Sequence, residues 1–239
     1  MIVYNLSIGK RGIELGTIIN GLAIIIGGAL GLVFKKGLPN KLSTNIMNGL
    51  ALCVLYIGIS GSLKSQNTLM LILSMVIGVI IGEALDLDGQ ITKLGEWVEK
   101  KVQREKSSVS ISEGFVTASL LFCVGAMAIV GSIQEGLTGN REMLLTKSML
   151  DGISSIIFSS SLGVGVIFSG GLVLIYQGGM TGLASVIAPF LTEAVINEMA
   201  AVGSLLIIGL SLNMLKMTNL KIMNFVPAIF IPIFLGLWF

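Results

Sequence analysis

Long apolar runs divide this chain into segments that only a lipid bilayer can accommodate. A spanning helix needs about 20 mainly apolar residues, and runs of that length recur between residues 15 and 238. Charged residues make up only 12% of the chain, whereas a soluble domain carries about 25%. So few charges could not cover a water-facing surface. The sequence therefore predicts an all-α, polytopic transmembrane helix bundle.

The apolar runs predict about eight spans of helical length. The predicted spans are 15–34, 43–63, 68–86, 114–134, 144–161, 163–178, 199–215 and 220–238. The segment 180–198 is different, because Pro189 interrupts it and Glu193, Asn197 and Glu198 add polarity to its second half. Polar, broken backbone at membrane depth is tolerated only against protein or a water-filled cavity. We therefore expect 180–198 to be re-entrant or interfacial.

A single transmembrane domain is predicted over residues 14–239, after an N-terminal extension at 1–13. Its longest polar interruption lies at 87–106, where Leu87, Ile91 and Trp97 recur at helical spacing among charged residues. This pattern is typical of an amphipathic helix on a membrane surface. The predicted order is repeat one (14–86), the amphipathic cytoplasmic helix (87–106), repeat two (112–178), the re-entrant or interfacial segment (180–198) and a C-terminal helix pair (199–239).

The connecting loops predict an orientation, because Lys and Arg accumulate on the cytoplasmic side of membrane proteins. If the chain enters its first helix from outside, most basic residues fall inside. The inner residues are then Lys35, Lys36, Lys41, Lys93, Lys100, Lys101, Arg104 and Lys106, with Lys216 and Lys221 added if 180–198 does not cross. The outer ones are Lys10, Arg11, Lys64 and Arg141, with Lys147 near that boundary. Both termini are therefore expected outside a bacterial cytoplasmic membrane.

An internal repeat is indicated by glycine spacing. The pair Gly16 and Gly27 matches Gly114 and Gly125, and a Gly-Leu turn follows each helix. The next helix then carries a polar-Gly pair, Asn48-Gly49 in one copy and Asp151-Gly152 in the other. A weaker third copy places Asn224 at the same position. Copies separated by an odd number of spans have inverted topology, which is a signature of secondary transporters, although duplication for packing alone would leave the same pattern.

The matched polar residues are the leading candidates for a binding site. Asp151 lies inside an apolar run, where a carboxylate costs about 2.5–3.5 kcal/mol at a helix centre. Asn48, Asp151 and Asn224 each have a small or helix-loosening neighbour and could offer oxygen ligands to a hard cation such as Na⁺. We expect the site near the midplane between the second and fifth helices. Two hydroxyls are expected beside it, Ser154 and Ser155.

Other polar residues are assigned to the approaches to that site. Glu135 and Glu193 are expected at the entrances, where a carboxylate attracts cations at little cost. Asn20, on the first helix, is a further polar residue of interest. Lys147 lies one helical turn before Asp151 and could neutralise it. That pair suits proton-coupled exchange or a purely structural cancellation of charge, and both interpretations stay open.

Several functions are excluded by what the sequence lacks. There is no His, so the commonest proton shuttle and metal ligand is missing. No nucleotide-binding or catalytic motif is present, so we expect neither an enzyme nor a bound cofactor other than a coupling Na⁺. The basic residues form no continuous patch for nucleic acid. Cys53 and Cys123 lie apart in apolar sequence and are expected to be inert thiols.

Four stretches resemble one known family. They are GTIINGLAIIIGG (16–28), SLLFCVGAMAIVGSIQEGLTGN (119–140), KSMLDGISSIIFSSSLGVGV (147–166) and NFVPAIFIP (224–232). Together they are similar to the YqgA/YdfK-like bacterial integral membrane proteins, over about residues 14–239. The resemblance implies a protein of the bacterial cytoplasmic membrane and hints at transport. It supplies no substrate, so no site residue follows from it.

The sequence alone favours a secondary transporter for a small ion or metabolite, coupled to Na⁺ or H⁺. One alternative is a passive channel, formed by a homo-oligomer around a pore. Another is a membrane scaffold or regulator that uses 86–113 as its cytoplasmic partner helix. Buried acids and inverted repeats favour the transporter, whereas a pore lined by Gly and Ser without an enclosed site would favour the channel.

Overall fold

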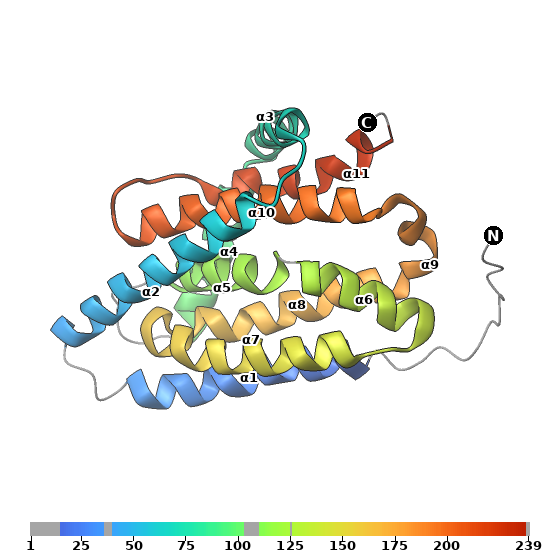
Figure 1. Cartoon of the computed structure of the whole chain (residues 1–239). Coiled ribbons are helices and arrows are strands. Elements are labelled where there is room, and N and C mark those ends of the chain that lie inside the picture. The colour runs from blue at the N-terminus through green and yellow to red at the C-terminus, as the bar shows by residue number, and fades with distance from the viewer. Residues whose placement is uncertain (1–14, 36–39, 103–109, 125, 238–239) are drawn as a thin grey trace.

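The computed structural model describes residues 15–35, 40–102, 110–124 and 126–237. In this part of the chain every regular element is a helix (Figure 1). The helices are α1 (Leu15–Lys35), α2 (Asn40–Ser62), α3 (Thr68–Leu85), α4 (Leu87–Val102), α5 (Ile111–Cys123), α6 (Ala126–Thr138), α7 (Glu142–Leu162), α8 (Gly165–Gly182), α9 (Ala184–Ile187), η1 (Ala188–Phe190), α10 (Glu193–Met214), η2 (Ile222–Phe230) and α11 (Ile231–Leu235). The predicted all-α class is confirmed. The proposed extension at 1–13 and the end of the amphipathic segment at 103–106 lie outside the described residues.

The helices form two bundles. The first bundle contains α1, α5, α6, α7 and α8, and the second contains α2, α3, α10, η2 and α11. Figure 1 shows the first bundle below and the second above, with α10 running across the top of the first. Helices pack much more extensively within each bundle than between the two. The boundary between the bundles is therefore the place where they could move relative to each other.

Glycines explain the closest helix pairs within each bundle. A side chain on Gly27 of α1 would overlap Ser155 and the Gly152 carbonyl of α7. In the second bundle, a side chain on Gly82 of α3 would overlap the backbone of Asn224 in η2. Membrane helices approach closely where small residues face each other. These glycines therefore allow α7 to pack closely on α1 and η2 to pack closely on α3.

The direction of the helices in the first bundle follows from their contacts. Thr17 at the start of α1 lies 3.5 Å from Thr181 at the end of α8, between their hydroxyl oxygens, so α1 and α8 are antiparallel. Gly165 at the start of α8 packs on Ile111 at the start of α5. Gly136 near the end of α6 packs on Thr181. These contacts show that α5 and α6 run parallel to α8. Because α8 is antiparallel to α1, α5 and α6 run opposite to α1, as an inverted repeat requires.

The predicted span at 114–134 is not one continuous helix. Two helices, α5 and α6, replace it and bend by 60° with respect to each other. Val124, which ends α5, has φ −85° and ψ 98°, outside the helical region. A second bend, of 64°, separates α8 from α9 and η1. Breaks of this kind expose backbone groups that must be satisfied by protein or by water.

The number of spans is between four and six by helix length and composition among the described residues. Four helices are each long and apolar enough to cross a membrane (α1, α2, α3 and α10), and the two bent pairs add up to two more spans. The prediction of about eight spans also counted α7 and the η2–α11 segment. α7 has the length to cross, but Lys147, Asp151 and its serines lower its hydropathy. Large apolar side chains on α1, α2 and α3 are exposed, as expected of a polytopic protein facing lipid.

The segment 180–198 does not form one helix. α8 ends at Gly182, and α10 begins at Glu193 after Thr192, whose hydroxyl accepts a hydrogen bond from the Val195 amide at 3.2 Å. Between them α9 has 4 residues and η1 has 3 residues. Neither has the length of about 20 residues that a span requires. The chain therefore returns into α10 through two short helices.

Candidate functional site

The polar centre of the first bundle is an ion pair between two residues of α7. The Lys147 ammonium lies 2.9 Å from Oδ1 and 2.7 Å from Oδ2 of Asp151. The four-residue spacing places both side chains on the same face of the helix. That face is covered by neighbouring helices, and the two residues keep only 7% and 6% of their surface exposed. Two opposite charges therefore meet in a protected interior.

Two amide side chains from other helices extend this pair. Asn20 of α1 donates its Nδ2 to Asp151 Oδ2 at 3.0 Å and to Gln177 Oε1 of α8 at 3.2 Å. Both amides have 0% exposure. Nevertheless, Asn20 Oδ1 and Gln177 Nε2 have no hydrogen-bond partner. Native proteins rarely leave buried polar atoms unpaired. The Asn20 oxygen is therefore an acceptor, and the Gln177 nitrogen a donor, that remain available near Asp151.

Glu135 of α6 lies near the same face but serves a different purpose. Its carboxylate accepts hydrogen bonds from the Gly16 amide at 2.7 Å and the Thr17 amide at 3.3 Å, and it contacts the Thr17 hydroxyl at 3.4 Å. Arg141 lies at 4.0 Å from the carboxylate. A negative charge at a helix N-terminus is favourable because the first amides of a helix lack internal partners. Glu135 therefore holds the start of α1 against α6.

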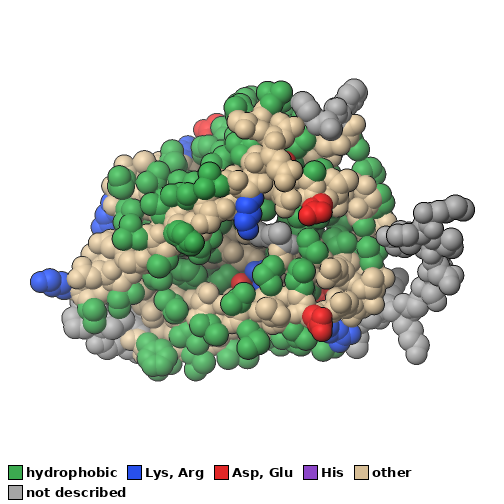
Figure 2. All heavy atoms as spheres, viewed as in Figure 1, with side chains coloured by type: hydrophobic (Ala, Val, Ile, Leu, Met, Phe, Trp, Pro, Cys, Tyr) green, Lys and Arg blue, Asp and Glu red, His purple; other side chains and the backbone are tan. Residues whose placement is uncertain are grey.

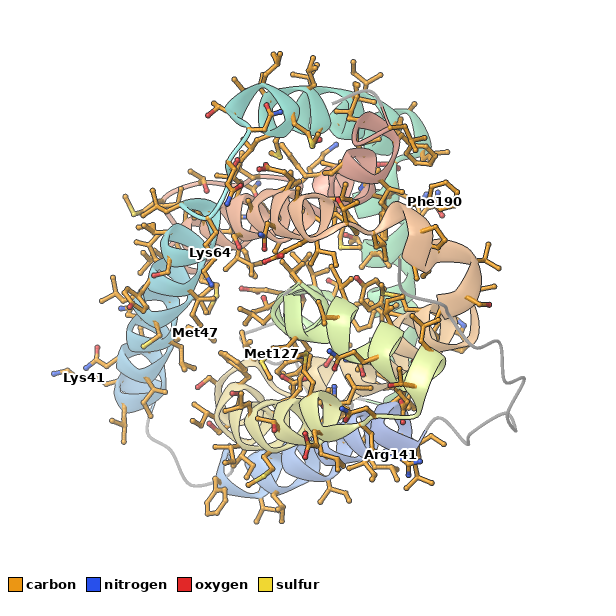
Figure 3. All side chains as sticks on the ribbon, turned by 45° about the vertical axis from the view of Figure 1, so that its right-hand side comes forward. Lys41, Met47, Lys64, Met127, Arg141 and Phe190 are labelled. Atoms are coloured by element: carbon orange, nitrogen blue, oxygen red, sulfur yellow. The ribbon has the colours of Figure 1, made fainter. Side chains whose placement is uncertain are left out.

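The ion pair lies on α7, and both α5 and α6, which bend with respect to each other, pack on this helix. Figure 2 shows that the face toward the viewer is hollowed between α2 and α10 above and α7 below. In Figure 3, Met47 of α2 and Met127 of α6 lie on opposite sides of the space between these helices. The boundary between the two bundles thus runs between α2 and α6.

The structure brings together only part of the predicted site. Asp151 is at its centre and Ser155 is buried one turn further along α7, where its hydroxyl donates to the Gly152 carbonyl at 2.8 Å. Ser154 is half-buried on the same helix. Asn48 is exposed on α2, which packs mainly on α10. The structure therefore does not bring Asn48 to Asp151, and the partners of Asp151 come from α1 and α8.

The other predicted residues lie elsewhere. Asn224 is buried in η2, where its Oδ1 accepts from the Asp88 amide at 2.8 Å and its Nδ2 donates to Glu83 at 2.5 Å. It ties η2 to the α3–α4 junction, away from Asp151. Glu193 is exposed in the first turn of α10. Only Glu193 thus has the exposure expected of an entrance residue, because Glu135 is 6% exposed.

The sequence analysis did not select Gln177 and ranked Asn20 below the matched residues. Each is a single carboxamide inside an otherwise apolar helix, TIINGLAIII for Asn20 and LVLIYQGGM for Gln177. A polar side chain in such a run faces protein because lipid offers it no hydrogen bond. That signal could have placed both amides in the interior. It could not have joined them to Asp151, since that depends on how α1, α7 and α8 pack.

Comparisons with known proteins now give the family. The family described as "Protein of unknown function (DUF554)" matches residues 15–237. The chain belongs to this family. It is 31% identical over 221 residues to the "Uncharacterized membrane protein YdfK" of Bacillus subtilis (strain 168), covering 91% of this chain and 93% of YdfK. It is 28% identical over 218 residues to the "Uncharacterized protein YqgA" of Escherichia coli (strain K12), covering 90% of this chain and 93% of YqgA.

No solved structure matches this chain. The relatives confirm the resemblance to the YqgA/YdfK-like family and the membrane location, and their names give no activity. The geometry of the Asp151 centre must therefore carry any statement about function. Throughout the described residues, no group of three or more His, Cys, Asp or Glu side chains is arranged to hold a metal ion.

Replacing Glu135 by Ala should loosen the start of α1. The substitution removes the acceptor for the Gly16 and Thr17 amides, and an unsatisfied buried donor costs about 1–3 kcal/mol. We expect a lower melting temperature and faster amide hydrogen exchange at residues 16–18, with little change in α10. Glu193→Ala is the matched control, because this exposed carboxylate should contribute below about 1 kcal/mol. Equal effects of the two substitutions would contradict the capping role of Glu135.

Proposed function

We propose that this protein is a secondary transporter that moves a small ion or metabolite across a bacterial cytoplasmic membrane. The observation that carries the proposal is the buried Lys147–Asp151 pair on α7, a helix that packs on both helices of the bent α5–α6 pair. Ionisable residues in membrane interiors are expensive and mark transport pathways. Transporters form their sites at discontinuous helices near the midplane. Here the helix that carries the ion pair packs on the discontinuous pair.

The arrangement of the two bundles supports the same proposal. Alternating access requires two rigid bodies that move against each other around a fixed site. The first bundle holds the ion pair, and the second bundle packs on the first across a boundary with fewer contacts. α1 and the α5–α6 pair run in opposite directions, in line with the inverted repeat that we propose for 14–86 and 112–178. Relative motion of the bundles would open the site to one side at a time.

The experiment is counterflow in proteoliposomes. Purified protein is first screened for ligands that raise its melting temperature, using alkali and alkaline-earth chlorides, amino acids and organic acids, because a ligand of the folded state stabilises it by mass action. Vesicles loaded with the best ligand are then diluted into a trace of the same ligand carrying a radiolabel. A transporter exchanges the two and accumulates label transiently. A homo-oligomeric channel only equilibrates it.

Asp151→Asn is the decisive variant, and Glu142→Gln is its matched control, because Glu142 is an exposed carboxylate on the same helix. We expect Asp151→Asn to abolish counterflow and the ligand-induced rise in melting temperature, while Glu142→Gln retains both. The contrary outcome has two parts: Asp151→Asn misfolds, and a second substitution that also removes Lys147 restores full counterflow. The pair would then be a structural ion pair, and the proposal would be contradicted. The absence of counterflow with every stabilising ligand would favour a scaffold. Counterflow that stays intact after deletion of 94–106 would argue against the scaffold.

A further inference from the structure

We propose that this protein forms a homodimer in which α2 packs against α2 of a second copy of the chain. The surface that makes this contact is the side of α2 turned away from α10, and we call it the outer α2 face. It consists of Asn45, Asn48, Gly49, Leu52, Tyr56 and Ile59, all of which are exposed. The inference does not depend on the Asp151 centre and goes beyond the proposed transport function.

The inner side of α2 is already occupied by α10. The Ser211 hydroxyl of α10 donates a hydrogen bond to the Ala51 carbonyl at 2.7 Å. A side chain on Gly58 would overlap Ile208 of the same helix. Ala51 and Val54 have 0% exposure. α2 is thus fixed on the second bundle, and its opposite side lies at the outer edge of the molecule (Figures 1 and 3).

α2 is both more exposed and more polar than the other helices of spanning length. Four helices of the described chain are each long and apolar enough to cross a membrane, and among them α2 has the smallest buried share, 17%, and the lowest hydropathy. α3 is nearly as exposed, with 22% buried, and has the highest hydropathy of the four. Lipid offers no hydrogen bonds to a polar surface. α3 therefore suits a lipid environment, whereas α2 requires protein on its outer face.

Two carboxamides make the outer α2 face polar. Asn45 and Asn48 lie inside the candidate span Thr44–Ser62, and no hydrogen bond joins either side chain to another described residue. Asn side chains in membrane helices form hydrogen bonds across helix pairs. The comparable surface of α3, at positions 69, 72, 76 and 80, carries only Leu, Ile and Val. The unpaired carboxamides therefore indicate a contact between helices at α2 and not at α3.

The spacing of the outer α2 face fits a second helix. Positions 45, 49, 52, 56 and 59 alternate in steps of four and three residues, as in the seam between two helices that cross at a small angle. Gly49 lies in this seam, and nothing is found within 4 Å of the side chain that it lacks. Small residues allow membrane helices to approach closely. Gly27 and Gly82 already meet another helix in this way, whereas Gly49 meets none within one copy.

The identity of the partner follows from symmetry. Two copies of one chain share the same orientation in a membrane, so a two-fold axis along the membrane normal brings each residue of α2 to its own counterpart. A carboxamide carries both donors and an acceptor, so Asn45 and Asn48 each match the same residue of the second copy. None of the six residues of the face is charged, so no like charges meet at the axis. A second copy thus satisfies this face without any other protein.

Cysteine cross-linking of the full-length protein in its membrane tests the interface directly. The chain has two Cys, and both are first replaced by Ser so that each introduced Cys is the only one. Leu52→Cys and Tyr56→Cys lie in the outer α2 face, and Ile72→Cys and Ile80→Cys are matched controls at exposed positions of α3. An oxidant is added at low protein density. We expect disulfide-linked dimers from the α2 variants and not from the α3 variants, because a disulfide requires Cα atoms within about 7 Å.

The strength of the dimer is measured by single-molecule counting of labelled protein in vesicles at decreasing protein-to-lipid ratio. Asn45→Leu combined with Asn48→Leu should raise the dimer dissociation constant about tenfold, since it removes the hydrogen bonds between the helices. Ile72→Leu combined with Ile80→Leu is the control and should leave the constant unchanged. Gly49→Val should also weaken the dimer. It should not lower the melting temperature of the dissociated protein in dilute detergent, because its side chain has no neighbour within one copy.

Three results would overturn the inference. A wild type that stays monomeric at every protein-to-lipid ratio would exclude the dimer. Equal cross-linking from the α2 and α3 variants would show random collision and not an interface. A dimer that keeps its full affinity when both Asn45 and Asn48 are Leu would have its contact elsewhere. None of these outcomes bears on counterflow, so the transport function stands or fails separately.

Discussion

Lys147→Met should be among the most destabilising single substitutions in this protein. Methionine fills much of the volume of lysine, so packing changes little. The substitution leaves the Asp151 carboxylate 6% exposed and without its ammonium partner. Removing one partner of a buried ion pair costs about 3–5 kcal/mol. We expect a marked fall in melting temperature relative to the wild type.

The double variant decides whether charge is the cause. Lys147→Met combined with Asp151→Leu removes both charges and should recover most of the lost stability, since replacing a buried pair by apolar groups is often neutral. Lys64→Met is the matched control, because Lys64 is exposed and its loss should have little effect. If the Lys147→Met protein has the same melting temperature as the wild type, water must reach Asp151 freely.

The sequence predicted the centre of the site because charge in an apolar run is visible without a structure. Asp151 stands out in α7, and the four-residue spacing from Lys147 follows from helix geometry. The pairing of Asp151 with Asn48 failed for a physical reason. A matched position in two repeats does not fix the rotation of each helix about its own axis. Asn48 lies on the exposed side of α2, and the neighbouring Gly49 has no atom of another residue near its missing side chain.

Two further features depend on packing that no local pattern reveals. Glu135 was expected at an entrance, and the structure places it against the first amides of α1, more than a hundred residues away in sequence. The bend between α5 and α6 interrupts a run that is apolar on both sides. Hydropathy reports the preference for lipid and not the continuity of the backbone. Such breaks are visible only once the neighbouring helices are placed.

Gly31→Val should separate α1 from α7. A side chain at Gly31 would overlap the Ile156 carbonyl oxygen and would lie 3.0 Å from the Ser159 Cβ. The obstacle is backbone, which cannot turn aside as a flexible side chain would. Overpacking costs about 1–3 kcal/mol in a well-packed core, and the upper end is expected here. The melting temperature should fall, and Asp151 should lose Asn20, because Asn20 lies on the displaced helix.

Gly49→Val and Gly171→Val are the controls for that prediction. Both glycines lie in helices, in α2 and α8, and nothing lies within 4 Å of the side chain that each substitution would add. Valine has a somewhat higher helix propensity than glycine, so both variants should melt at or slightly above the wild-type temperature. Equal melting temperatures for all three variants would mean that α1 and α7 do not pack as closely as their glycines allow. The contact between Asn20 of α1 and Asp151 of α7 would then be contradicted as well.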